Sequence, residues 1–218
     1  MKLLLISATE SEIAPLAGYL AGLHPFSGNN VSISTIITGV GMVSTTYSLM
    51  KALQAERYDF VLQAGVAGSY DRNISLGEVV FVVSEQFGDL GAEDHDNYLD
   101  VFEMGLVQKD AQPFLGMKLF TPLSSIHEKI PFRRAHGLTI NTVSGRESTI
   151  KMRSEKYGAD VESMEGAAFH YVCLKERIAF AQIRAISNYV MPRDKSQWKM
   201  KEAIINLNKG LIGFIESL

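Results

Sequence analysis

Six short runs rich in Val, Ile and Leu recur along the chain, at residues 2–8, 31–38, 60–64, 78–84, 138–143 and 178–187. Such near-continuous apolar runs are typical of strands buried on both faces, as in parallel sheets. Helical patterns lie between several of the runs, and strands that alternate with helices build α/β sheets. We therefore expect residues 1–218 to form one α/β domain, a three-layer α/β/α arrangement with a central mixed, largely parallel sheet.

Three segments have apolar residues at helical spacing, and each is expected to turn this stripe toward the core. The stripes are Ile13, Leu16, Ala17 and Leu20; Val43, Tyr47, Met50 and Leu53; and Ile204, Leu207, Leu211 and Ile215. Between residues 86 and 116 the chain is acidic and aromatic without a sustained period, which predicts a long surface excursion. Loops of this length are more often functional or oligomeric than idle.

Composition excludes several classes of protein. The chain has 218 residues and a formal net charge of −3, so long-range attraction to nucleic acid or anionic membranes is not expected. Its one cysteine, Cys173, lies in a mostly apolar stretch, which favours a buried thiol and a reducing compartment. The first apolar run is too short for a signal peptide and is followed by Glu10 and Glu12, so a cytoplasmic protein is expected.

Two polar segments follow one another within one helix length. Residues 161–168 place acidic groups at the predicted start of a helix, whose apolar stripe comprises Met164, Ala167, Ala168, Tyr171 and Val172. Acidic residues at a helix start have a purely structural explanation, because they interact favourably with the helix dipole. The next predicted strand, however, ends in Ser187 and Asn188, at the sheet edge where α/β proteins bind ligands. We expect the two polar ends to converge on one small molecule.

These two segments resemble the nucleoside phosphorylase and nucleosidase superfamily. The matching residues are Met164-Glu165 and the run Arg184-Ala185-Ile186-Ser187-Asn188. The resemblance implies that Met164 and Glu165 bind a ribose and that Asn188 contacts a purine. It also directs Arg184 to the same region, where it orders the attacking water and the acids or serves as a structural partner of Glu162.

Glu12 has two competing interpretations. Thr9 and Glu12 fit a capping box, which is a sufficient structural reason for the glutamate. In the nucleosidases that the chain resembles, a glutamate at this point activates the attacking water. The interpretations compete because hydrogen bonds to a carboxylate weaken it as a base. We favour catalysis, since the first strand is expected to end at the same sheet edge as Asn188.

Two glycine turns follow predicted strands. The run at 38–44 mimics a dinucleotide fingerprint, but Ser44 replaces its third glycine and Asp59 precedes the next strand instead of following it. No NAD and no other cofactor is therefore expected. In the run at 63–69, the resemblance places Gly65 and Val66 beside the ribose and the nucleophile.

The nucleophile itself is predicted from what the second turn lacks. Phosphorylases of the superfamily carry an arginine just before its first glycine, where this chain has Gln63 and Ala64, and many nucleosidases have serine at the place of Val66. A phosphate dianion needs charge-assisted donors. Water is therefore the expected nucleophile, which makes the chain a hydrolase.

Asn188 stands where adenine-releasing nucleosidases have an aspartate. An amide cannot protonate a leaving base but can donate to N7 or to O6. The resemblance implies a 6-oxopurine, because family members with Asn at this place tend to act on such bases; a flipped amide could also bind adenine. The runs 188–198 and 87–94 resemble those of futalosine hydrolases, which points to Trp198 and Asp89 as substrate-binding residues. The alternative for the first run is an exposed charged loop in which Trp198 anchors the last helix.

The loop at 142–149 lacks the aromatic residue that the family places over the purine, so Phe87, Phe102 or Trp198 is expected to replace it. The five histidines show no metal-ligand spacing and no metal is expected; each is interpreted as a surface or core residue. The sequence thus predicts a homo-oligomeric purine nucleosidase resembling futalosine hydrolase, which would release hypoxanthine from futalosine in menaquinone biosynthesis. The alternatives are a methylthioadenosine/S-adenosylhomocysteine nucleosidase and a non-catalytic nucleoside-binding module.

Overall fold

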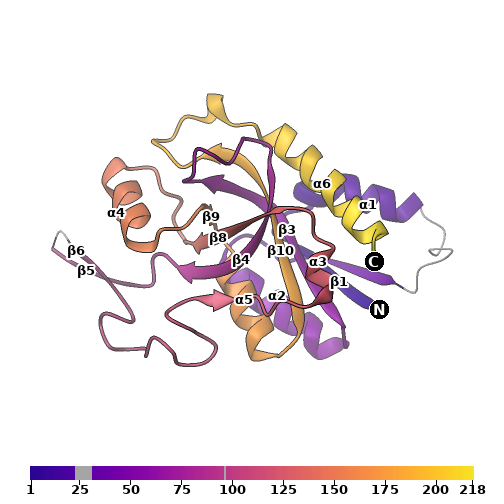
Figure 1. Cartoon of the computed structure of the whole chain (residues 1–218), viewed down its shortest axis with the longest axis horizontal. Helices are drawn as coiled ribbons and strands as arrows, with labels where there is room; N and C mark the ends of the chain where they lie inside the picture. The colour runs from indigo at the N-terminus through magenta and orange to yellow at the C-terminus, as the bar shows by residue number, and fades with distance from the viewer. Residues whose placement is uncertain (23–30, 96) are drawn as a thin grey trace.

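A mixed sheet runs through the computed structural model, which describes residues 1–22, 31–95 and 97–218 (Figure 1). The sheet is formed by β1 (Lys2–Ser7), β2 (Ser32–Ile37), β3 (Phe60–Ser69), β4 (Val79–Phe87), β7 (Leu119–Phe120), β8 (Arg133–Thr139), β9 (Val161–Ser163) and β10 (Ala179–Tyr189). The helices are α1 (Glu10–Gly22), α2 (Met42–Ala55), α3 (Ser125–Glu128), α4 (Glu147–Tyr157), α5 (Gly166–Lys175) and α6 (Met200–Glu216), with a 3₁₀ turn η1 at Lys195–Gln197. A separate hairpin comprises β5 (Gly91–Asp94) and β6 (Asn97–Asp100).

The sheet is partly closed. Strand β3 pairs in parallel with β1 and β10 and antiparallel with the short β9. The path β10–β4–β8–β9 leads back to β3, so these strands form a ring, and β1 and β2 extend from it as an open edge. Parallel pairing joins β1 with β2, β4 with β8 and β8 with β9, whereas β10 and β4 run antiparallel. The predicted mixed, largely parallel sheet is confirmed. Its partial closure was not predicted from the sequence.

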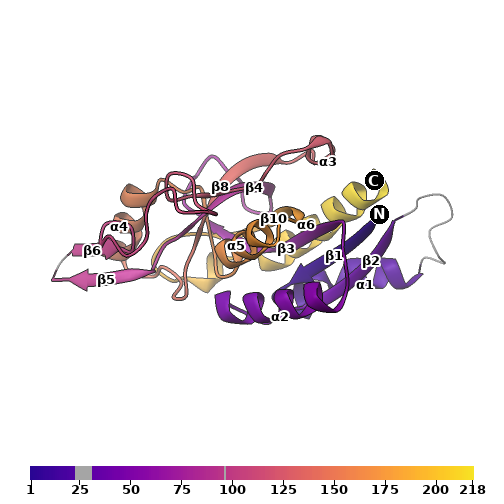
Figure 2. The same ribbon diagram turned by 90° about the horizontal axis from the view of Figure 1, so that it is seen from below.

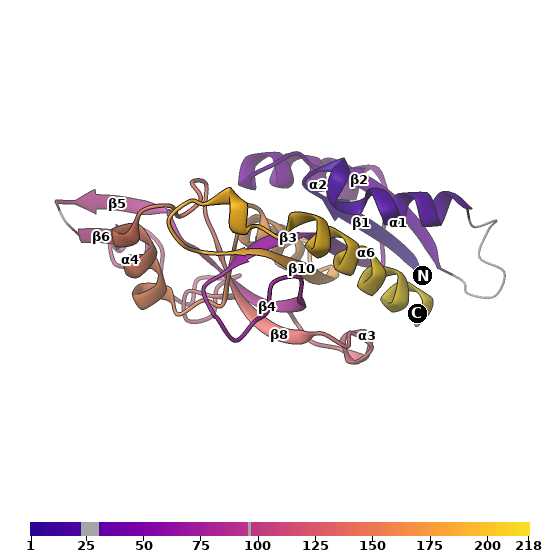
Figure 3. The same ribbon diagram turned by 90° about the horizontal axis from the view of Figure 1, so that it is seen from above.

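The near-continuous apolar strands are explained by helices on both faces of the sheet. Successive side chains of a strand point to opposite faces. Leu3 and Leu5 of β1 therefore join a cluster with α1 and α6, while Leu4 and Ile6 join a second cluster with α2 and α5. Figure 3 shows α1 and α6 over the first face, and Figure 2 shows α2 and α5 from the other side. These are the three predicted layers.

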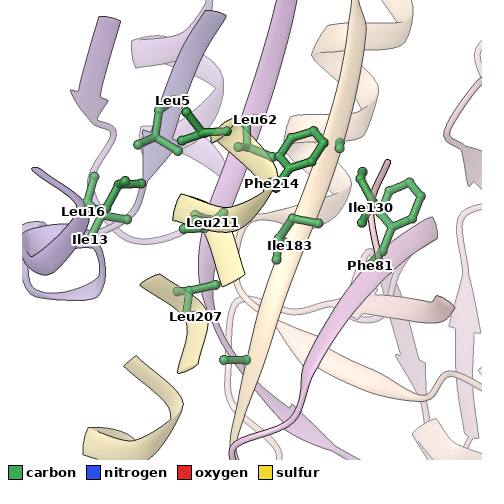
Figure 4. Packing of buried hydrophobic residues seen from close by; sticks show 14 of the residues in the cluster. Leu5, Ile13, Leu16, Leu62, Phe81, Ile130, Ile183, Leu207, Leu211 and Phe214 are labelled. Atoms are coloured by element: carbon green, nitrogen blue, oxygen red, sulfur yellow. The ribbon is translucent and has the colours of Figure 1, made fainter. Parts of the chain in front are cut away.

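The largest cluster lies between α1, α6 and the sheet. Leu207, Leu211 and Phe214 of α6 point toward Leu62 of β3 and Ile183 of β10 (Figure 4). These side chains are 2% exposed or less, so the closing helix is held by its apolar stripe as predicted. This packing fixes α6 above the two strands that carry most of the polar site.

Helix α2 corrects one prediction. Val43 and Tyr47, predicted to face the core, are 83% and 67% exposed. The buried residues of α2 are Thr45 and Leu49, while Met50 and Leu53 pack partly against the core. The apolar residues of this helix occupy two faces, and only one of them is covered by the chain itself.

The segments around the predicted site also differ from expectation. Residues 161–163 form strand β9, because they pair with β8 and β3, and α5 begins only at Gly166. Residues 65–69, predicted as a glycine turn, continue β3 as an extended strand paired with β10. Within the predicted excursion 86–116, the chain forms the end of β4 and the β5–β6 hairpin, which projects from one end of the molecule (Figure 1). Among the described residues, no helix is long and apolar enough to cross a membrane.

Candidate active site

A cavity of about 400 Å³ opens at the ends of β1, β3 and β10 and at the start of α5. Its lining brings together six of the nine residues predicted for the site: Glu12, Val66, Met164, Glu165, Asn188 and Trp198. Segments from both ends of the chain and from its middle therefore meet at one place. The two glutamates on which the predicted chemistry depends face the same cavity.

Glu12 is held by the turn that follows β1 and by β3. Its Oε2 accepts hydrogen bonds from the backbone and the hydroxyl group of Thr9, at 3.0 and 2.9 Å, and from Ser7 Oγ at 3.1 Å. The first of these is a capping-box contact, in which the glutamate satisfies the N–H group before the helix. Oε1 accepts the backbone N–H of Val66 at 3.0 Å. The predicted capping contact exists, and it leaves the carboxylate at the cavity wall.

Glu165 immediately precedes α5 and is 4% exposed. Its Oε2 lies 3.3 Å from Nη2 of Arg184, and its Oε1 accepts the backbone N–H of Gly41 at 3.1 Å. Gly41 has φ near 91°, a conformation that glycine adopts without strain, so the turn before α2 can present its N–H group to the carboxylate. Arg184 therefore pairs with Glu165, and the contact that was considered with Glu162 is not the one observed.

Gly65 gives these groups room. A Cβ atom at this position would lie 2.5 Å from Nη1 of Arg184 and 2.9 Å from Oε1 of Glu12. Any side chain would displace the arginine or the glutamate. Gly65 and Arg184 lie behind the cavity wall and do not line it, so the structure places them as supports of the two glutamates.

Asn188 lies inside β10, beside a register shift in the pairing with β3. Ser187 Oγ lies 2.8 Å from Oδ1 of Asn188, and Nδ2 of Asn188 donates to the carbonyl oxygen of Tyr189 at 3.0 Å. These contacts orient the amide and leave one of its two N–H groups for a ligand. Ser187 was not predicted as a site residue. Its hydroxyl group lies at the carbonyl end of the amide, and the carbonyl oxygen of Tyr189, which can only accept, fixes which end donates.

Asp89 lies outside the cavity lining. Its carboxylate accepts the backbone N–H groups of Asn141 and Thr142 at 2.6 and 3.2 Å, and Nη2 of Arg153 lies 3.6 Å away. Arg153 also donates to the carbonyl oxygen of Thr142. Asp89 thus holds the loop that carries Val143 to the cavity, and the structure gives no support to direct substrate contact.

Of the three aromatic residues proposed to cover the base, Trp198 lines the cavity. Phe87 and Phe102 instead pack edge-on against Phe114, at centroid distances of 6.2 and 5.1 Å. Trp198 is half-buried, and the guanidinium group of Arg193 lies 5.8 Å from its ring. Trp198 thus precedes α6 and also lines the cavity, and its contact with a substrate stays a prediction.

A buried polar network behind Arg184 was missed by the sequence analysis. Gln182 accepts from Nε of Arg184 at 2.9 Å and donates to Glu85 at 2.9 Å, and its Nε2 lies 3.1 Å from Nε2 of His170. Burial raises the pKa of Glu85 to about 7 and lowers the pKa of His170 to about 3. The only sequence signal for this network is that polar residues such as Glu85 and Gln182 interrupt apolar runs. The sequence alone does not show which of these residues contact one another.

Comparison with known proteins identifies the family. The model of the phosphorylase superfamily matches residues 2–216. The chain belongs to the phosphorylase superfamily. It is 30% identical to a futalosine hydrolase of Thermus thermophilus over 95% of this chain and 92% of that protein. It is 24% identical to a 5′-methylthioadenosine/S-adenosylhomocysteine nucleosidase of Glaesserella parasuis, over 86% of each chain.

The superfamily fold is confirmed by a solved structure. A futalosine hydrolase mutant of Helicobacter pylori strain 26695 superposes with a TM-score of 0.81, at 18% identity and over 100% of both chains. The closed part of the sheet and the helices on its faces are thus those of a phosphorylase-superfamily member. The resemblance stated from Met164-Glu165 and the Arg184–Asn188 run is confirmed at the level of the family.

His170 gives a prediction about pH. Its folded pKa lies below the ordinary value, so the native state binds fewer protons than the unfolded state between about pH 6.5 and pH 3. Its contribution to stability is present above pH 6.5 and is lost as the pH falls, by up to about 1.4 kcal/mol per pH unit. Glu85, whose folded pKa is raised, contributes a slope of opposite sign over part of this range, so the His170 contribution is the difference between wild type and His170→Gln in urea unfolding between pH 7 and pH 4. His95→Gln, at a histidine side chain that is 96% exposed, should keep the wild-type slope, and an equal slope in both variants would contradict the assignment.

Proposed function

We propose that this protein is a purine nucleosidase of the futalosine hydrolase type, which hydrolyses futalosine to hypoxanthine and dehypoxanthine futalosine in menaquinone biosynthesis. The observation that carries the proposal is the shared cavity of Glu12, Glu165 and Asn188. The 30% identity to a futalosine hydrolase over almost the whole chain supports the choice of substrate.

Glu12 is proposed to take the proton of the attacking water. Among the described residues, Oε1 of Glu12 accepts one hydrogen bond, from Val66, and a carboxylate oxygen has a second lone pair. A water bound there lies beside the backbone of β3. General-base catalysis of this kind typically contributes about 10²–10⁴-fold.

Glu165 is proposed to bind the ribose hydroxyl groups and to stabilise the sugar as its bond to the purine breaks. That step leaves positive charge on the sugar and negative charge on the base. At an effective dielectric constant of 20, a unit charge at 4 Å stabilises an opposite charge by roughly 4 kcal/mol. Arg184 holds the carboxylate in place from behind, at 3.3 Å.

Water, and not phosphate, is the proposed nucleophile. Among the described residues, the cavity lining contains neither arginine nor lysine. The guanidinium group of Arg184 is 1% exposed and already engaged by Glu165, Gln182 and the carbonyl oxygen of Val66. A phosphate dianion would find no charge-assisted donor in this lining.

Asn188 is proposed to donate its free N–H group to N7 or O6 of the purine. The carbonyl oxygen of Tyr189 accepts one N–H group of Asn188, and the second N–H group of the same amide is the donor proposed for the base. Hypoxanthine offers acceptors at both atoms, whereas the 6-amino group of adenine is a donor. This orientation favours a 6-oxopurine.

The protein is proposed to act as a homo-oligomer. Val43 and Tyr47 of α2 are exposed. They line a groove of about 730 Å³ together with Met50, Phe87 and Tyr171. An apolar surface of this kind is typical of a protein–protein interface. A cytoplasmic location and the absence of a cofactor stay predictions of the sequence.

A substrate panel tests the function. Purified protein should release hypoxanthine from futalosine, and it should do so faster than it releases the base from inosine or methylthioadenosine, measured by chromatography of the free base. Added phosphate should neither increase the rate nor yield a sugar 1-phosphate. Faster cleavage of methylthioadenosine would favour the alternative nucleosidase, phosphate dependence would indicate a phosphorylase, and binding without cleavage would indicate a non-catalytic module.

Glu165→Gln should lower kcat by about 10²–10³-fold, because the amide keeps the volume but removes the charge opposite the cationic sugar. Circular dichroism checks that the variant is folded. Glu103→Gln, on an exposed residue of the segment after β6, is the matched control and should keep wild-type kcat. Turnover near the wild-type rate in folded Glu165→Gln would remove this glutamate from the mechanism.

Asn188→Asp should shift preference toward 6-aminopurine nucleosides. An aspartate can carry a proton to N7 and can accept from the 6-amino group, neither of which the oriented amide does. The ratio of kcat/KM for methylthioadenosine to that for futalosine is therefore expected to rise. If the ratio does not change, Asn188 does not read the base.

A further inference from the structure

Glu85 is a fully buried carboxylate with no contact to the cavity. It lies on β4, and Gly137 and Gly166 approach it so closely that a Cβ atom at either position would collide with its carboxylate. Two neighbouring elements, β8 and the start of α5, thus leave space for this one charged group. A buried charge without partners is strongly destabilising, so we expect the contacts of Glu85 to stabilise its carboxylate.

Three donors point at Glu85. Gln182 Nε2 donates to Oε1 at 2.9 Å, Thr139 Oγ1 donates to Oε2 at 2.9 Å, and the backbone N–H of Gln86 also contributes. The Thr139 hydroxyl in turn accepts the backbone N–H of Ala167 at 2.7 Å, in the first turn of α5. Glu85 is therefore the acceptor at which two hydrogen-bonded chains end.

The orientation of the Gln182 amide follows from its neighbours. His170 Nδ1 must donate to the carbonyl oxygen of Leu119, 3.0 Å away, so its Nε2 is the acceptor in the neutral ring. Gln182 Nε2 then donates to both His170 and Glu85, and Gln182 Oε1 accepts from Nε of Arg184. A flipped amide would oppose donor with donor at Arg184 and acceptor with acceptor at the other two contacts.

We propose that Glu85 is a positioning residue for the active site, which acts through Gln182 on the guanidinium group of Arg184 and thereby on Glu165. The chain of contacts is continuous: Glu85 to Gln182 at 2.9 Å, Gln182 to Arg184 at 2.9 Å, and Arg184 to Glu165 at 3.3 Å. This inference rests on the proposed role of Glu165 in binding the ribose. Glu85 touches no substrate; it determines where the Arg184–Glu165 pair stands.

Glu85→Gln tests the inference. The variant side chain has one oxygen for the side-chain donors of Gln182 and Thr139, so its amino group either opposes Gln182 or forces the Thr139 hydroxyl group to give up donating. We expect kcat to fall about 10- to 100-fold, as for small displacements of catalytic groups, with KM and the folded circular dichroism spectrum unchanged. Glu176→Gln makes the same chemical change at an exposed residue beyond the other end of α5 and should keep the wild-type kcat.

A second variant separates positioning from general support of the fold. Gln182→Met breaks the same chain at its next member and should lower kcat in the same way. Because both residues act through one path, the double variant should be no slower than the slower single variant. Losses in kcat that multiply, or wild-type kcat in folded Glu85→Gln, would overturn the proposal. If Glu85→Gln does not fold, wild-type kcat in Gln182→Met overturns it as well.

A spectroscopic measurement distinguishes this proposal from the proposed function. In a ¹⁵N-labelled sample, the Nε–H signal of Arg184 should be protected from exchange in the wild type and shifted or lost in Glu85→Gln. If the wild type cleaves no purine nucleoside, the proposed function has failed, and this signal alone decides the positioning role. An unchanged, protected Nε–H signal in Glu85→Gln would contradict it.

Discussion

The candidate active site is built around one buried ion pair, between Arg184 and Glu165. Both side chains are nearly inaccessible, and taking two charges out of water costs several kcal/mol per ion. Hydrogen bonds offset this cost when each nitrogen atom of the guanidinium group has a partner. Here the partners come from three elements: Gln182 on the same strand, the carbonyl oxygen of Val66 on β3, and Glu165 before α5. Arg184 thus fixes the relative placement of β10, β3 and α5. The geometry of the site therefore depends on the packing around this arginine.

The pairing of β3 with β10, which closes the sheet, accommodates the Arg184–Glu165 pair. Strand β3 can pair with β10 past the arginine because Gly65 presents no side chain, where a Cβ atom would lie 2.5 Å from Nη1 of Arg184. At Gly68 a Cβ atom would lie 3.0 Å from Val190 and 3.2 Å from Asn188, so this glycine also keeps its strand close to the cavity. Glycine usually weakens a strand, and here it allows close approach of backbone and side chain. Gly65 and Gly68, which resemble a turn signal in the sequence, therefore allow β3 to continue as a long strand.

The limits of prediction follow from the range of the interactions. The buried strands β1, β3, β4 and β10, the α6 stripe and the Thr9–Glu12 cap depend on neighbouring residues, so the sequence predicts them correctly. The predictions for 31–38 and 138–143 are wrong in part, since β2 is an edge strand without a buried residue and β8 ends at Thr139. The convergence of Glu12, Glu165 and Asn188 on one cavity follows from the sheet-edge rule together with the family resemblance. The exposed face of α2 could not be predicted, because periodicity does not show which of two apolar faces the chain covers. The side-chain partners of Glu85 lie 54 and 97 residues away in the sequence, and β9 pairs with β8 and β3, so the sequence carries no local signal for either.

The two interpretations of Glu12 prove to be compatible, because they concern different oxygen atoms. Oε2 receives the capping contacts from Thr9 and the hydroxyl group of Ser7, which fix the rotamer and satisfy the N–H group before α1. Oε1 accepts the backbone N–H of Val66, and both Glu12 and Val66 line the cavity. The cap therefore orients the proposed base instead of consuming it. Pre-organisation of this kind lowers the entropic part of a barrier, since the carboxylate is already placed before a water binds. Glu165 is held in the same way, because its two oxygen atoms contact Gly41 and Arg184, so both acids are fixed by contacts within the protein.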